Sequence, residues 1–287
     1  MRLALATCVL VILAAGTACG ERSEPTGPTI RLYPVTVADS EDRAITLSRE
    51  PGRIVTLTEA TADIVRALGN GRRLVGAPGR FFGPSGALVA SRLRAARPDL
   101  VLAASDTDGI GTRATTVKAP VYFAPNGSVE EVERAITRIG LLLGHPVEAR
   151  RVVHGVRERR AQIARELAGT PAVSVFVDTG FFTTVPERSL IGDLVRQAHG
   201  RNVAGPSPEP GPFDLDVLLQ LDPAVYLATS DSDTTLRVLR KDRRTRKLTA
   251  IREGRFVIVD ARLLEPGPRV GEGLREIARA LHPNAVH

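Results

Sequence analysis

Seven residues in predicted loops have side chains suited to holding a small molecule. They are Thr58, Arg80, Phe81, Phe82, Phe181, Phe182 and Arg188. Aromatic rings offer a large contact area, and a guanidinium group pairs with carboxylates or polarised oxygens through two parallel hydrogen bonds. Two Phe-Phe pairs with arginines close by therefore predict a site for a bulky, partly apolar, anionic ligand. The alternatives are that the phenylalanines anchor their loops in the protein core and that the arginines are ordinary surface charges.

Catalytic chemistry has no comparable support. The chain lacks a Gly-x-Ser-x-Gly elbow, a His-Glu-x-x-His motif, a phosphate-binding loop and a plausible cysteine nucleophile. A bare metal ion needs convergent histidines and carboxylates, and none of the 5 histidines falls in a predicted binding loop. We therefore expect a binding protein and not an enzyme, with no metal site and no cofactor.

The segments that position these loops alternate between strand and helix patterns. A polar turn separates two short predicted strands, 31–37 and 44–47, and this pattern predicts a β-hairpin. Further strands are predicted at 53–57, 74–77, 100–103, 120–123, 172–177, 225–228 and 256–259. Helices are predicted at 58–68, 88–96, 129–143, 189–199, 215–221 and 271–281. Such alternation predicts an α/β fold with mostly parallel sheets, whose ligands bind beyond the carboxyl ends of the strands.

One long helix divides this alternation into two halves. Residues 146–167 carry Val152, Val156, Ile163 and Leu167 on one face at helical spacing, and arginines fill much of the remaining surface. We expect two Rossmann-like α/β lobes, at 31–145 and 170–287, joined by a single backbone helix at 146–169. The ligand cleft would lie between the lobes.

The N-terminus reads as an export signal. Arg2 precedes a short apolar run, and small residues lead to Cys19. We predict a signal peptide at 1–18, a lipidated Cys19 and a flexible tether over 19–30, because this cleavage site resembles that of bacterial lipoproteins. The protein would be exported and anchored at the outer face of the cytoplasmic membrane. The alternative is an ordinary secretory signal with an incidental cysteine.

The chain is basic, with a formal net charge of +7. No helix-turn-helix, zinc-finger or RNP-type signature accompanies the charge, so nucleic acid is not an expected partner. The excess fits either a solubilising surface or attraction to anionic lipid or an acidic ligand. The basic run at 240–255 is a solvated face or a contact with anionic lipid.

Five segments resemble one family, in order and spacing. They are 53–79, 96–104, 189–205, 214–229 and 251–283, and the first reads RIVTLTEATADIVRALGNGRRLVGAPG. They are similar to the ABC-transporter substrate-binding proteins for iron-siderophores, haem and vitamin B12. The resemblance implies two lobes on a rigid helix, a monomer, and delivery of the ligand to a permease and its ATPase. Haem iron is usually coordinated by an axial Tyr or His. The three tyrosines fall in predicted strands, so a siderophore or a corrinoid is the favoured ligand.

Docking to the permease is where the sequence departs from this family. The resemblance implies one exposed acid on each lobe, and the matching positions are Asp216 and Ser91. Ser91 is not acidic, and Arg92 beside it has the opposite charge. Either docking is asymmetric, or the protein is an envelope lipoprotein that keeps the fold as a non-transport binding or interaction module. Asp216 also fits a first-turn acid that favours the helix dipole.

Overall fold

A computed structural model describes residues 32–104, 110–114, 117–207 and 209–286. They belong to one compact unit that begins at Leu32. The predicted signal peptide, Cys19 and the tether lie outside the described residues. Within the described part, no helix is long and apolar enough to cross a membrane.

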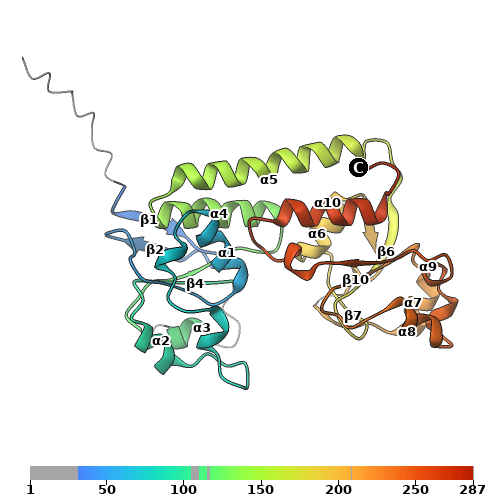
Figure 1. The fold of residues 1–287 in the computed structure, drawn as a ribbon, viewed down its shortest axis with the longest axis horizontal. Coiled ribbons are helices and arrows are strands. Elements are labelled where there is room, and N and C mark those ends of the chain that lie inside the picture. The colour runs from blue at the N-terminus through green and yellow to red at the C-terminus, as the bar shows by residue number, and fades with distance from the viewer. Residues whose placement is uncertain (1–31, 105–109, 115–116, 208, 287) are drawn as a thin grey trace, which may run out of the picture. The chain divides into compact units, whose positions relative to one another are not determined.

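The first lobe contains an antiparallel hairpin and a parallel sheet (Figure 1). The hairpin pairs β1 (Val35–Ala38) with β2 (Ala44–Leu47), as predicted. The sheet has the order β3 (Ile54–Thr56), β4 (Leu100–Ala103), β5 (Val121–Phe123), and all its residues are buried. Burial on both faces explains why these strands are continuous apolar runs. The helices are α1 (Glu59–Ala67), α2 (Ala90–Ala96), α3 (Ile110–Ala114) and α4 (Val129–Leu142).

The prediction of a strand at 74–77 is wrong. Leu74 forms a single bridge with Ile54, and the extended segment then stops. Gly76 has a φ of 84°, and Pro78 begins a 3₁₀ helix, η2 (Pro78–Phe81), after the shorter η1 (Gly71–Arg73). Because proline lacks an N–H donor and fixes φ, this segment does not continue into the sheet.

The second lobe contains a four-stranded parallel sheet. Its order is β11 (Phe256–Val259), β10 (Val225–Thr229), β6 (Val173–Asp178), β8 (Gly200–Asn202). The edge strand β8 was not predicted, because Gly-Arg-Asn has little strand propensity and is extended only through its pairing with β6. Two short strands, β7 (Thr183–Thr184) and β9 (Gly211–Pro212), pair antiparallel beside this sheet. The helices are α6 (Leu190–Gln197), α7 (Leu215–Leu221), α8 (Leu236–Lys241), α9 (Thr249–Arg252) and α10 (Val270–Leu281), with 3₁₀ turns η4 (Thr245–Lys247) and η5 (Ala261–Leu263).

The long helix α5 (Pro146–Glu166) contacts both α4 of the first lobe and α10 of the second (Figure 1). Three of the four predicted face residues, Val156, Ile163 and Leu167, are buried. Val152 is only half-buried, and its neighbour Val153 is buried instead. One continuous apolar cluster includes side chains of α4, α5, α6 and α10. Each lobe also has a smaller cluster of its own. The two lobes therefore share a core through their helices.

A glycine sets the spacing of α4 and α5. A Cβ atom at Gly140 would lie 2.3 Å from the Cβ of Ala149, well inside van der Waals contact. Gly140 therefore allows the two helices to approach closely, at a position where helix propensity alone would favour alanine.

Candidate ligand site

The pair Phe181-Phe182 forms a strained turn at the end of β6. The N–H of Thr183 donates to the carbonyl of Gly180 at 2.7 Å, so the phenylalanines are the two central residues of a tight turn. Their φ values are 50° and 60°, the left-handed conformation that two-residue hairpin turns fill with Asn-Gly. A left-handed residue with a side chain costs about 1–2 kcal/mol.

This turn presents one ring to solvent and keeps the other against the core. Phe181 is 84% exposed, the most exposed large apolar side chain among the described residues. Phe182 is half-buried and packs against the core cluster of the second lobe. Phe181 therefore stands where the sequence predicts a ligand contact, at the carboxyl end of a parallel strand.

A buried carboxylate supports the turn from below. Asp178 is fully buried and accepts hydrogen bonds from the Gly180 N–H at 2.8 Å, the Tyr226 hydroxyl at 2.7 Å and the Thr234 hydroxyl at 2.8 Å. Burial, followed by the charge of Asp178, raises the pKa of Tyr226, which stays a neutral donor. No ion pair to Asp178 is found among the described residues. Sequence reasoning missed Asp178 because it is a single polar residue at the end of an apolar strand.

The phenylalanine pair of the first lobe lies differently. Phe81 is only 2% exposed and belongs to the core cluster of that lobe, so its expected role as a ligand contact is corrected to loop anchoring. The 3₁₀ turn after Pro78 directs its ring inward. Phe82 is half-buried against the same cluster. Arg92 donates to the carbonyls of Phe82 at 2.6 Å and Arg80 at 3.2 Å, and this fixes the loop while the Arg80 side chain stays exposed.

Thr58 is the N-cap of α1. Its hydroxyl accepts from the Thr61 N–H at 3.2 Å and shares a hydrogen bond with the Thr61 hydroxyl at 2.9 Å. Its oxygen is thus engaged in helix capping, which is the ordinary role of threonine at this position. The cap places Glu59 in the first turn of α1, where it faces the second lobe.

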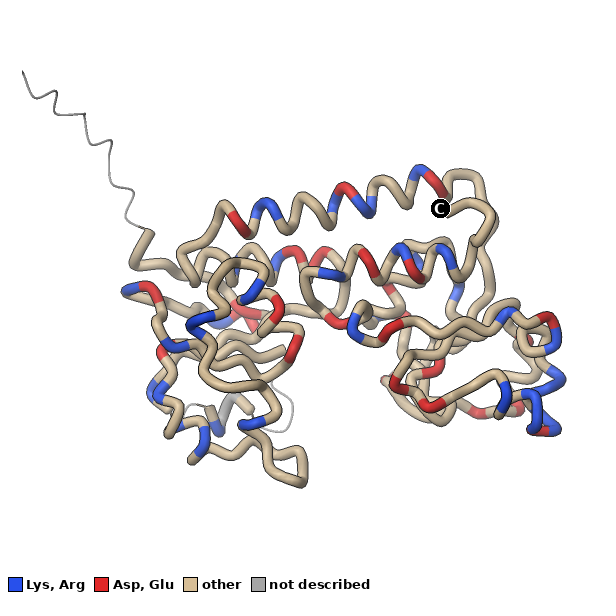
Figure 2. Tube along the Cα trace, in the orientation of Figure 1, with Lys and Arg blue, Asp and Glu red and all other residues tan. Residues whose placement is uncertain are grey.

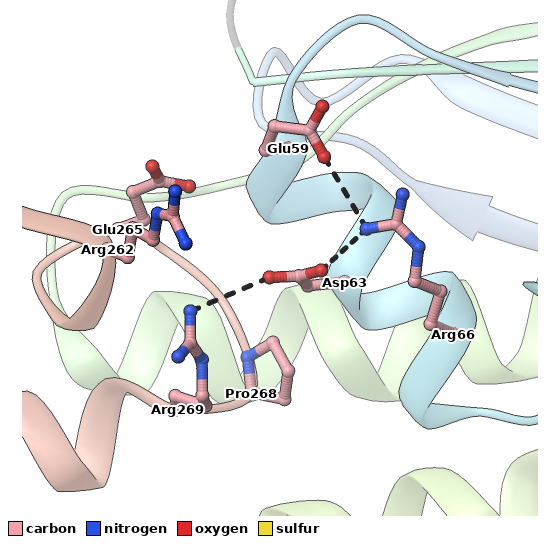
Figure 3. Close-up of a pocket in the computed structure, with 7 residues that line it drawn as sticks. All are labelled: Glu59, Asp63, Arg66, Arg262, Glu265, Pro268 and Arg269. Carbon is pink, nitrogen blue, oxygen red and sulfur yellow. Dashed lines mark hydrogen bonds and ion pairs between the residues drawn. The ribbon is translucent and has the colours of Figure 1, made fainter. Parts of the chain in front are cut away.

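A pocket of about 650 Å³ lies between α1 and the segment that leads into α10 (Figure 3). We call it the α1 pocket. Its lining residues are Glu59, Asp63, Arg66, Arg262, Glu265, Pro268 and Arg269. Arg66 pairs with Asp63 at 2.7 Å, and Arg269 of the second lobe reaches Asp63 of the first at 3.9 Å. The pocket is therefore a set of carboxylates and guanidinium groups contributed by both lobes.

The electrostatics of this pocket affect Glu265. Partial burial, followed by the carboxylates of Asp63 and Glu59, raises the pKa of Glu265. The sequence predicts ligand binding beyond the carboxyl ends of the strands, and Glu59 and Glu265, which come after β3 and β11 along the chain, line this pocket. It misses Asp63 and Arg269, because their meeting depends on how α1 lies against the entry to α10.

Arg188 lines a different pocket, of about 400 Å³, between the start of α4 and the start of α6. Its other lining residues are Gly127, Ser128, Glu131, Glu187, Asp193 and Arg196. None of the predicted phenylalanines lines it. The structure therefore does not gather the seven predicted residues around one pocket.

A chain of hydrogen bonds crosses from lobe to lobe beside this second pocket. Buried Asp193 of α6 accepts from the Val129 N–H at the start of α4, at 2.9 Å, and from Gln197 at 2.7 Å. Gln197 accepts from Arg160 of α5 at 2.9 Å, and Arg160 donates to buried Glu133 of α4 at 2.9 Å. These contacts connect α4, α5 and α6, and we call them the inter-lobe network.

Arginine side chains lie close to both predicted docking positions, Asp216 and Ser91. Asp216 lies in the first turn of α7 with its side chain 74% exposed, and it forms an ion pair with Arg244. Ser91 is exposed on α2, next to Arg92 and close to exposed Arg94. In the described part of the chain, no three His, Cys, Asp or Glu side chains are placed to hold a metal ion.

Comparison with known proteins agrees with this architecture. The model of a family described as periplasmic binding protein matches residues 90–263. The uncharacterized ABC transporter substrate-binding lipoprotein YvrC of Bacillus subtilis is 22% identical, with 98% of this chain and 96% of that protein aligned. A cobalamin-binding protein of Halobacterium salinarum is 26% identical over 88% of this chain and 76% of its own length.

Among solved structures, Helicobacter pylori CeuE with Ni(II) bound superimposes with a TM-score of 0.77 at 16% identity, over 88% of this chain and 90% of that one. This likeness shows a shared fold. Two α/β lobes, a long helix packed on both of them and the family match lead to one conclusion: the chain belongs to the periplasmic binding protein family.

Proposed function

We propose that this protein captures a bulky, partly apolar solute between its lobes and delivers it to an ABC importer. Exposed Phe181 on its strained turn is the observation that carries the proposal. Strain at such a turn persists only where the surrounding structure imposes it, and it is characteristic of ligand sites. The α1 pocket would add polar contacts at the edge of the ligand. The relative named as an ABC transporter substrate-binding lipoprotein supports the transport role.

A corrinoid or a ferric siderophore is the ligand class that we propose. The relative named as a cobalamin-binding protein supports the corrinoid. The volume of the α1 pocket lies within the usual range for small-molecule sites, roughly 300–1,000 Å³. Flat apolar parts of a chelate would stack on Phe181, and amide or carboxylate groups would pair with Arg262 or Arg269.

Haem is less well supported, because the tyrosine hydroxyls are either hydrogen-bonded within the protein or buried. Tyr33 donates to the carbonyl of Leu142 at 2.9 Å, Tyr226 donates to Asp178, and Tyr122 is fully buried. None of the three has a free hydroxyl at the surface to serve as an axial ligand.

The cellular arrangement is also a proposal. Export followed by lipid attachment at Cys19 would hold the protein beside its permease and raise its effective concentration there. Asp216 would be the docking acid of the second lobe.

The direct test is thermal-shift screening of the Cys19→Ser protein against cobalamin, ferric siderophores and haem, followed by calorimetry. Ligand that binds only the folded state raises Tm by mass action. A shift with cobalamin or a siderophore that Phe181→Ala reduces supports the proposal. A shift that Phe181→Ala leaves unchanged refutes the site, and no shift with any compound refutes the ligand class.

The ion pair of Asp216 with Arg244 favours a second candidate, a binding or interaction module that does not serve transport. The pair masks one docking acid, and Ser91 replaces the other. Uptake of the identified ligand by cells that lack this protein separates the two. Unchanged uptake supports the second candidate, whereas uptake that is lost and then restored by the intact gene supports transport.

A further inference from the structure

The strongest unexplained feature is a cationic surface on the second lobe, formed by α8, η4 and α9. Its Lys and Arg residues are exposed, and Figure 2 shows their positions along the backbone gathered at the corner that Figure 1 labels α8 and α9. They are Arg237, Arg240, Lys241, Arg243, Arg244, Arg246, Lys247 and Arg252. We call this the α8–α9 surface. It lies apart from the residues that line the α1 pocket.

The charges are segregated by the way the segment folds. The apolar side chains Leu239, Leu248 and Ile251 are buried in the core cluster of the second lobe. Once these short helices direct their apolar residues inward, the alternating basic residues all face outward. The segment therefore concentrates positive charge on the solvent-exposed side of the second lobe.

Little negative charge compensates this surface. Among the described residues, Arg244 is the one member with an ion pair, and its partner is Asp216. Asp242 lies within the segment, but its carboxylate accepts the N–H groups of Thr245 at 2.9 Å and Arg244 at 2.8 Å, and these bonds lower its pKa. Asp242 is therefore occupied as a local cap and does not form an ion pair with the guanidinium groups.

An apolar side chain stands within the same surface. Val238 of α8 is 54% exposed and is flanked along the chain by Arg237 and, two residues later, Arg240. Basic side chains around an exposed aliphatic group are the pattern of segments that lie on the headgroup layer of a bilayer.

We propose that the α8–α9 surface binds anionic phospholipid headgroups and holds the second lobe against the membrane. Each basic residue near an anionic bilayer contributes independently, without a defined partner geometry. That matches a surface of dispersed cations on three short helices, of which Arg244 alone forms an ion pair among the described residues, better than it matches a shaped protein contact. The proposal goes beyond solute capture, and its readout does not require any solute.

The test is co-sedimentation of the chain from residue 20 onward with phosphatidylcholine vesicles, with and without phosphatidylglycerol. This chain lacks the predicted lipid and the apolar run of the predicted signal peptide but keeps the whole compact unit that begins at Leu32, so binding reports the folded surface. We expect binding only to vesicles that contain phosphatidylglycerol, and weakening as added salt screens the charges. Absence of such binding overturns the proposal.

Two triple variants with the same change in net charge locate the site. The α8 variant carries Arg237→Gln, Arg240→Gln and Lys241→Gln, and the control carries Arg150→Gln, Arg151→Gln and Arg165→Gln on exposed positions of α5. We expect the α8 variant to lose about tenfold or more in vesicle partitioning, and the control less than about twofold. Equal losses in the two variants would show that net charge alone governs binding and would overturn the assignment.

A charge-conserving variant separates lipid from an acidic protein. Arg237→Lys with Arg240→Lys should retain vesicle binding, because headgroup attraction depends on charge and not on the guanidinium fork. Loss of binding in this variant, or binding only to membranes that contain the transporter, would identify an acidic protein surface as the partner instead.

Discussion

The turn at Phe181 predicts a trade-off between stability and binding that can be measured at one residue. Asparagine tolerates the left-handed conformation far better than phenylalanine does. Because the Phe181 ring is 84% exposed, its removal loses little buried apolar area. Phe181→Asn should therefore stabilise the fold by about 1 kcal/mol, the lower end of the cost of a left-handed side chain. For a chain of this size, that corresponds to an increase in Tm of about 2 °C.

The same substitution should weaken ligand binding. Burying an aromatic side chain is worth about 1.5–3 kcal/mol, so losing the ring should lower affinity about ten- to a hundredfold. Phe181→Ala is the matched control, since it removes the ring but does not tolerate the left-handed conformation better. It should lose affinity without the gain in Tm.

Calorimetric titration with the ligand found by screening, together with urea unfolding, measures both effects. A Phe181→Asn protein that is less stable than the wild type would refute the strain argument. Unchanged affinity in both variants would refute the placement of the ligand at this turn.

Three further changes test the supports of the fold and site. Asp178→Asn puts amide hydrogens against groups that already donate and should lower the free energy of unfolding by about 3 kcal/mol, measured in urea; an unchanged midpoint would contradict the carboxylate's role. Gly140→Ala should destabilise by about 1–3 kcal/mol through overpacking against Ala149, while Gly155→Ala, an open position on α5, should stabilise by about 0.5–1 kcal/mol; two changes of the same sign would dismiss the close approach. The raised pKa of Glu265 means that the folded state favours the protonated form, so stability falls as pH rises above the ordinary value of 4.5. Glu265→Gln should melt above the wild type at neutral pH, with a difference that shrinks as the pH falls toward 4.5, and a constant difference across this range would disprove the coupling.

Regular elements with a strong periodic pattern were predictable from the sequence. The sequence pattern correctly places most of the apolar face of α5, the buried run of β10 (Val225–Thr229) and the start of α4 after Ser128. A side chain caps the start of α4, since the Glu131 N–H donates to the Ser128 hydroxyl at 3.2 Å. The Glu131 carboxylate reaches back to the N–H of Gly127 at 2.7 Å, one residue before the position that a capping box uses.

For the candidate binding side chains, the sequence predicts the loops that carry them but not which way each side chain points. Phe81 and Phe181 have the same residue type and the same kind of neighbours along the chain, yet one is buried and the other exposed. The difference arises from a 3₁₀ turn in one loop and a left-handed turn in the other. The left-handed turn has no local sequence signal, because Phe-Phe is an unfavourable pair for the conformation that it adopts.

The contact between Asp63 and Arg269 was beyond sequence reasoning for a different reason. The two residues are far apart along the chain, and helical spacing does not show which face of α1 meets the second lobe. Only the packing of the shared core brings them together.

The inter-lobe network has a consequence for how loading is sensed. Buried Asp193 would lose the hydrogen bond from the Val129 N–H if the lobes swung apart, and a hydrogen bond to a charged group is worth about 1.5–3 kcal/mol. If the proposed solute binds between the lobes, the empty protein is already organised for it, and little conformational entropy is spent on capture. A transporter that distinguishes loaded from empty protein would then have to recognise the solute itself, or side chains such as Phe181 that we propose it covers, and not a large change in the angle between the lobes.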